Sequence, residues 1–196
     1  MSTYQSVCSA AKNKIYLFLI FILSCQTTPI SSTQSPQQKT IASASYKNYI
    51  SYDLDFAPYK KKREELEKKL SINLKNRGEA HITLITPPEY DQLKKHLSDE
   101  EIHQAAQKFL KTKPQFEILC TGTGSKVLHN QNEKTFFLVV KSEELLRFRQ
   151  ELTKNKNIPT SEFNPQVFYP HITLGFTERD LHIDDGVIKD KNACLK

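Results

Sequence analysis

The tetrapeptide His-Ile-Thr-Leu occurs twice in this sequence, at residues 81–84 and again at residues 171–174. Both copies lie in short stretches that have the pattern of a β-strand, where side chains point alternately to opposite faces. The histidine and threonine of each copy therefore share one face, while the isoleucine and leucine share the other. Each strand is expected to bury its aliphatic pair and to present an imidazole beside a hydroxyl group.

Strand and helix patterns alternate between residue 47 and residue 196. The strand patterns are short runs of alternating or continuous apolar residues, at 49–56, 80–85, 116–120, 136–140 and 171–176. The helix patterns start at N-capping residues or space leucines four apart, at 60–70, in a stretch up to 97, from 98 onward and at 142–153. Strands and helices mixed through about 150 residues predict one α+β domain, residues 47–196.

The first 25 residues have the order of a secretory signal. Lys12 and Lys14 precede nine consecutive apolar residues, 15–23. Nine helical residues span about 14 Å, which is too short for a bilayer core of about 30 Å. The segment 22–25, Ile-Leu-Ser-Cys, then resembles a bacterial lipobox, in which cleavage before the cysteine is followed by lipidation. The alternative is an ordinary cleaved signal with an incidental Cys25.

Residues 26–46 are rich in Gln, Ser, Thr and Pro, and they cannot bury an apolar face. We therefore expect a disordered tether there. Together with the signal, it predicts an exported protein, either a bacterial cell-envelope lipoprotein that meets the membrane only through its lipid or a secreted one. Export would allow Cys120 and Cys194 to form a disulfide. A buried free Cys120 and an exposed Cys194 are the favoured alternative.

Composition narrows the possible partners. The net charge of +6 favours an anionic partner. The lysines and glutamates of residues 60–65 are interleaved, which is typical of a solvated helix face. The sequence has neither a P-loop nor a dinucleotide fingerprint. We expect His96 and His103 on a solvated helix face, His129 and His182 in surface loops, and neither a metal site nor a cofactor.

Two His-Thr strands beside one groove would supply two acid–base groups and two hydroxyl donors. That set suits attack on a phosphodiester, with one imidazole taking a proton from water and the other protonating the departing oxygen. The threonines would hold the non-bridging oxygens. Because an unperturbed histidine has a pKa of about 6.5, the two rings can carry opposite protonation states near neutral pH. The alternative is two half-buried strands whose His and Thr are simply tolerated at the surface.

The paired motifs, in a domain of this size, resemble the two-histidine (2H) phosphoesterase superfamily. Its members include 2′,3′-cyclic nucleotide phosphodiesterases and RNA 2′,3′-cyclic phosphodiesterases of the ligase-like type. The resemblance implies a bilobal α+β fold, with two antiparallel sheets facing across a central cleft and helices outside. It also implies a metal-independent, monomeric hydrolase for cyclic phosphate ends of nucleotides or short RNA, whose catalytic residues would be His81, Thr83, His171 and Thr173.

Many superfamily members carry an aromatic residue and a proline just before the second histidine, and Tyr169 and Pro170 match them. Tyr169 lies two residues before His171, so it is expected on the same strand face, within reach of phosphate or base. The stretch 169–182 also resembles a branch of the superfamily associated with RNA repair. Export fits that role least well, because repair substrates are cytosolic.

Three basic residues near the motifs are candidates for contact with a polyanion. Arg77 precedes the first motif, Arg179 follows the second, and Lys126 follows a loop expected around residues 122–124. The alternative function is a non-catalytic phosphate- or nucleotide-binding envelope protein that uses the same cleft. Intact histidines and threonines in both motifs disfavour that alternative.

Overall fold

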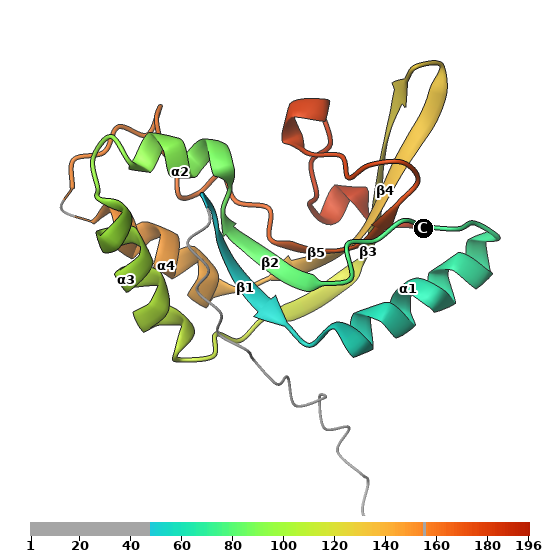
Figure 1. Cartoon of the computed structure of the whole chain (residues 1–196), viewed down its shortest axis with the longest axis horizontal. Coiled ribbons are helices and arrows are strands. Elements are labelled where there is room, and N and C mark those ends of the chain that lie inside the picture. Colours follow the sequence, from blue (N-terminus) through green and yellow to red (C-terminus); the bar gives the residue numbers. More distant parts are fainter. Residues whose placement is uncertain (1–47, 155) are drawn as a thin grey trace, which may run out of the picture. The chain divides into compact units, whose positions relative to one another are not determined.

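The computed structural model describes residues 48–154 and 156–196, so the expected signal, tether and Cys25 lie outside the described residues. The predicted α+β fold is confirmed (Figure 1), and its elements are β1 (Ile50–Leu54), α1 (Phe56–Leu70), β2 (Ala80–Ile85), α2 (Pro87–Leu93), α3 (Asp99–Leu110), β3 (Glu117–Leu128), β4 (Gln131–Lys141), α4 (Glu143–Thr153), β5 (His171–Phe176) and two 3-10 turns, Ile183–Asp185 and Lys191–Ala193. Across the described ranges, every helix is too short or too polar to cross a membrane.

The strands form two antiparallel sheets, as the resemblance implies. β1 pairs with β2, and β4 pairs with both β3 and β5. The two motif strands, β2 and β5, run side by side where the sheets meet (Figure 1). Helices α3 and α4 pack against β1 and β2, while α1 packs against β5. This arrangement brings together two motifs that are ninety positions apart in the sequence.

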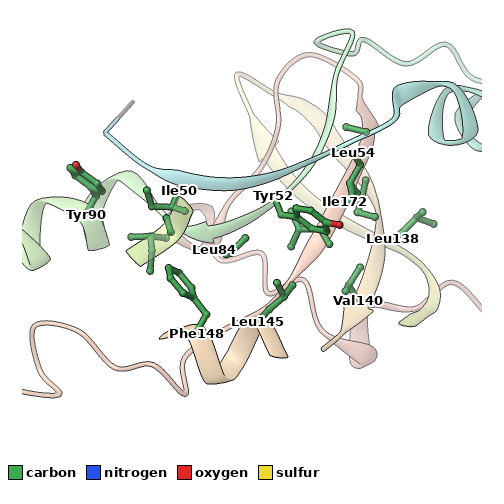
Figure 2. Close-up of a cluster of buried hydrophobic side chains, with 14 of the residues drawn as sticks. Ile50, Tyr52, Leu54, Leu84, Tyr90, Leu138, Val140, Leu145, Phe148 and Ile172 are labelled. Atoms are coloured by element: carbon green, nitrogen blue, oxygen red, sulfur yellow. The ribbon is translucent and has the colours of Figure 1, made fainter. Parts of the chain in front are cut away.

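The alternation predicted for the motifs is confirmed. Ile82 and Leu84 of β2 and Ile172 of β5 are fully buried, and Leu174 of β5 is 2% exposed. Their neighbours of the same strands, the histidines and threonines, are only partly buried. Figure 2 shows Leu84 and Ile172 pointing into one apolar cluster. The buried pairs thus fix which face of each strand the imidazoles occupy.

Helix starts follow local capping chemistry. The predicted capping box at Ser98 and Glu101 opens α3, and Ser142 caps α4 as expected. Thr86 caps α2, whose first two residues are the prolines that follow β2. Proline suits this position because the first helical N–H groups have no partner within the helix. α1 begins four residues earlier than predicted, since Asp55 accepts a hydrogen bond from the helix start.

The expected loop around residues 122–124 is wrong, because β3 continues through it to Leu128. A Cβ atom on Gly122 would lie 2.6 Å from the Phe137 ring, and one on Gly124 would lie 2.2 Å from Val187. The glycines therefore serve close packing rather than a turn. What packs there is the C-terminal strap, which we define as residues 181–196.

The strap (red in Figure 1) folds back over the β3-β4-β5 sheet. Leu181 and Val187 bury their side chains with Phe137 of β4. The N–H of Leu195 donates to the carbonyl of Thr121 at 2.9 Å. This return corrects the expectation of two free thiols, because Cys120 of β3 and Cys194 of the strap form a disulfide.

The favoured free-thiol interpretation failed for a physical reason. Pairing requires two Cα atoms within about 7 Å, and only the fold of the strap creates that proximity. In the structure the two Cα atoms are 5.8 Å apart. Nothing in the local sequence around either cysteine encodes this contact.

Candidate functional site

A cleft of about 610 Å³ opens where β2 and β5 meet. Both motifs contribute to its wall, and the polar residues that they supply are His81, Thr83, His171 and Thr173. The structure thus brings together all four residues that the sequence proposes for catalysis. The two histidines, however, lie in different surroundings.

His171 is held by the backbone just before its own strand. Its Nδ1 lies 2.7 Å from the carbonyl oxygen of Tyr169. A carbonyl oxygen only accepts hydrogen bonds, so Nδ1 carries the hydrogen and a neutral ring keeps its lone pair on Nε2. The burial of the ring, followed by the positive charge of Lys189, lowers the pKa of His171 well below its usual value. Both effects favour the neutral imidazole.

His81 stands beside a carboxylate instead. Its Nδ1 lies 3.6 Å from Oε1 of Glu79, and its ring centre lies 6.3 Å from that of Tyr49. A negative charge at this distance stabilises a protonated imidazole. The two histidines of the cleft thus have different neighbours, a backbone carbonyl at His171 and a carboxylate at His81.

A network of buried polar groups lies behind the second motif. The carboxylate of Asp180 accepts hydrogen bonds from Lys189 Nζ at 2.9 Å, Thr135 Oγ1 at 2.6 Å and Thr173 Oγ1 at 3.1 Å. The Lys189 and Asp180 side chains are only 3% and 6% exposed. Thr173 therefore donates to Asp180, and not to an open position in the cleft, where the sequence predicts that it holds a phosphate oxygen.

Burial and mutual attraction set the pKa values of Asp180 and Lys189. Burial opposes ionisation of Asp180, but the charge of Lys189 and the hydrogen bond from Thr135 outweigh it and hold the pKa of the carboxyl below its usual range. Burial lowers the pKa of Lys189, and the charge of Asp180 counteracts part of that effect. Each group thus stabilises the charged form of the other.

The candidate substrate contacts fall into two groups. Arg77 and Tyr169 line the cleft. Lys126 is not among the lining residues, and it forms an ion pair with Asp185 at 3.3 Å. Arg179 also pairs with Asp185, at 2.6 Å. These last two cations therefore pair with one carboxylate of the strap, and neither lines the cleft.

The remaining histidines correct the sequence expectations in part. His103 is buried, with 7% exposed, and its Nε2 lies 2.9 Å from the hydroxyl of Tyr90. It therefore does not lie on a solvated face. His96 contacts Glu162 at 2.8 Å. His182 lines the cleft, where burial lowers its pKa.

Sequence reasoning missed Asp180 and Lys189 as parts of the site. Neither belongs to a repeated motif, and the partners of Asp180 come from β4, β5 and the strap. The short spacing of Asp180 and His182 after the second motif was the one available signal. Their side chains approach to 3.9 Å.

The cleft is lined by side chains of two kinds. Apolar and aromatic ones include Tyr49, Pro87, Pro88, Val167 and Phe168. Polar and basic ones include Asn76, Arg77, His182 and Lys189. Within residues 48–154 and 156–196, no group of three or more His, Cys, Asp or Glu side chains is arranged to hold a metal ion.

Residues 48–182 match the family model described as Swiss Army Knife, 2H phosphoesterase domain. The chain belongs to the 2H phosphoesterase family. The matched region of this 2H phosphoesterase includes both motifs and Asp180, and it ends before Lys189 and Cys194 of the strap. Neither the comparison with curated proteins nor the comparison with solved structures returned a match.

Proposed function

We propose that this 2H phosphoesterase hydrolyses 2′,3′-cyclic phosphate ends of nucleotides or short RNA, or a closely related phosphodiester, by acid–base catalysis between its two motif histidines. The observation that carries the proposal is that both His-Thr pairs line one cleft. Its volume of about 610 Å³ lies within the range of small-molecule sites and suits a nucleotide.

His171 is the general base in this proposal. Its Nδ1–H is committed to the carbonyl of Tyr169, and its Nε2 carries a lone pair. A base must be unprotonated before it can act, and the low pKa of His171 favours that state at neutral pH. Nε2 would take one proton from the attacking water as the water oxygen bonds to phosphorus.

His81 is the general acid. The carboxylate of Glu79, 3.6 Å from Nδ1, favours an imidazolium that can give up a proton. As the P–O bond to one ribose oxygen breaks, His81 would protonate that oxygen. One proton enters at His171 and one leaves from His81, so solvent must exchange both before the next turnover.

The phosphate and the nucleoside would use different parts of the cleft. Arg77 offers a positive charge to the non-bridging oxygens, and Thr83 offers a hydroxyl donor. Tyr49 and Phe168 line the same cleft, where a base can pack against their aromatic rings. A cleft that offers both a cation and aromatic rings favours a nucleotide over an inorganic anion.

The first test uses purified protein with the four 2′,3′-cyclic mononucleotides and a short oligonucleotide that ends in a cyclic phosphate. Hydrolysis is expected to persist in chelator. His81→Ala and His171→Ala should each lose about 10²-fold or more, the usual scale for a positioned proton donor or acceptor. The double variant should lose less than the product of the two, because the groups act as one unit.

His129→Ala is the matched control, because His129 lies in the turn between β3 and β4 and is not among the cleft residues. It should keep wild-type activity. Full activity in His171→Ala, or complete inhibition by chelator, would contradict the mechanism. Tight binding of a cyclic nucleotide without turnover would instead favour a non-catalytic binding protein.

Export is proposed alongside this activity, because residues 1–25 have the order of a signal with a lipobox-like Cys25. The protein would then act in the cell envelope or outside the cell, attached to the membrane only by an N-terminal lipid. The disulfide between Cys120 and Cys194 supports an oxidising compartment.

A further inference from the structure

The buried pair of Asp180 and Lys189 has no role in the proposed chemistry described above. A buried ion pair is expensive, because desolvating two charges can exceed their mutual attraction. Apolar residues of similar size would fill the same space at less cost. The position of the pair suggests what it does.

Lys189 and His171 contact the same aromatic ring. The Nζ of Lys189 lies 5.4 Å from the ring centre of Phe137, and the ring of His171 packs edge-on against it at 5.9 Å between centres. Asp180 joins this group through Lys189 and through Thr173. Both residues of the second motif are therefore next to the pair.

We infer that the Asp180–Lys189 pair positions the second motif, with Lys189 placing a positive charge on the Phe137 ring that His171 packs against and Asp180 fixing the hydroxyl of Thr173. This inference rests on the proposed function and adds two positioning residues to it. Lys189 acts through space, because a positive charge near a ring disfavours an imidazolium. Asp180 keeps Lys189 charged while it is buried.

Other groups also face His171, and their effects must be separated from that of Lys189. Asp180 and His182 act on the charge of the His171 ring, and Arg77, Glu79 and His81 line the same cleft. Asp180 favours the protonated ring, whereas Lys189 and His182 oppose it. The effect of Lys189 on the pKa of His171 exceeds the opposing effect of Asp180, so the pair as a whole lowers it.

The sign of the expected change follows from these charges. Lys189→Met removes the positive charge and leaves the carboxylate, so the pKa of His171 should rise. Since the base must be unprotonated, the acid limb of kcat/KM should move to higher pH, by about one unit or more. Lys189→Arg keeps the charge and should leave the limb near that of the wild type. The double variant Asp180→Asn/Lys189→Met, which lacks both charges, should lie in between.

The experiment uses the full chain with its disulfide intact. Two readouts are recorded for each variant, namely the pH dependence of kcat/KM and the titration of the His171 ring by NMR. The His171 signal is assigned by its absence in His171→Gln. Because the NMR titration needs no turnover, it tests the pair even if the cyclic phosphate substrate is wrong.

The predicted order of the His171 titration is wild type and Lys189→Arg lowest, the double variant next, and Lys189→Met highest. A folded Lys189→Met protein with an unchanged titration would overturn the inference. If Lys189→Met does not fold, the double variant, in which no buried charge is left unpaired, is compared with Lys189→Arg. Equal titrations in those two would overturn it as well.

Discussion

At the scale of single residues, the two threonines of the cleft differ in what their hydroxyl groups bind. Thr173 donates to Asp180 at 3.1 Å. Thr83 lines the cleft, and it makes no side-chain hydrogen bond to any of residues 48–154 and 156–196. Within the described residues, the repeated motif therefore contains one hydroxyl with a protein acceptor and one to which the proposed mechanism assigns a phosphate oxygen.

This difference predicts that Thr→Val substitutions at the two positions affect different quantities, catalysis at Thr83 and stability at Thr173. Thr83→Val should lower kcat/KM about tenfold or more, because a hydrogen bond to a charged phosphate contributes roughly 1.5–3 kcal/mol. It should leave the free energy of unfolding nearly unchanged. Thr173→Val should lower that free energy by about 1–3 kcal/mol, since a buried carboxylate loses a donor.

Steady-state kinetics and chemical denaturation of both variants check the prediction. Thr160→Val is a suitable control, because Thr160 is exposed in a turn outside the cleft lining. Equal kinetic losses in Thr83→Val and Thr173→Val, with equal stabilities, would show that the two hydroxyls have equivalent roles.

The candidate catalytic residues were readable from the sequence because strand alternation is local. Once residues 81–84 and 171–174 are strands, the period of two puts His and Thr on one face. The roles of the two histidines were not readable. The proposed roles rest on Glu79 at one ring and on Lys189 at the other, and Lys189 comes near His171 only through the packing of the strap.

At the scale of secondary structure, Arg149 of α4 joins the elements that form one side of the cleft. Its guanidinium pairs with Glu89 of α2 at 2.6 Å and donates to the backbone carbonyls of Leu84 and Val167. It also packs on the ring of Phe168 at 4.8 Å. A planar group with five donors suits such a site better than an ammonium group does.

Arg149→Met should therefore lower the free energy of unfolding by about 3–5 kcal/mol, the usual effect of breaking a buried ion pair. Arg149→Lys should recover little of the free energy of unfolding that Arg149→Met loses. Arg147→Met, an exposed change on the same helix, should stay within about 0.5 kcal/mol of the wild type. Urea denaturation of the three variants checks the order, and a wild-type stability in Arg149→Met would contradict it.

The elements themselves were predicted best where local signals were strong. The capping box at Ser98 fixed a helix start, and β5 begins and ends as expected. β3 was predicted to stop before residues 122–124, because glycine is a common turn residue. Glycine is needed in β3 because Phe137 and Val187 approach its backbone closely. That approach is a tertiary contact, which no window of sequence contains.

At the scale of the whole molecule, the proposed lipid anchor decides where the activity would be found. If Cys25 is lipidated, cells fed a fatty-acid probe should label the wild-type protein and leave Cys25→Ser unlabelled. Cys8→Ser should keep the label, because Cys8 precedes the apolar run. Equal labelling of the wild type and Cys25→Ser would contradict the lipoprotein proposal, and a cleaved, unlabelled wild type would favour an ordinary signal.

The disulfide between Cys120 and Cys194 closes a stretch of 74 residues and anchors the strap that carries Lys189. A crosslink of that span is expected to stabilise the fold by about 4 kcal/mol. A chain still in a reducing cytosol would hold Lys189 beside Asp180 by non-covalent contacts alone. Oxidation of the two thiols would therefore add a covalent tie to the segment that carries Lys189.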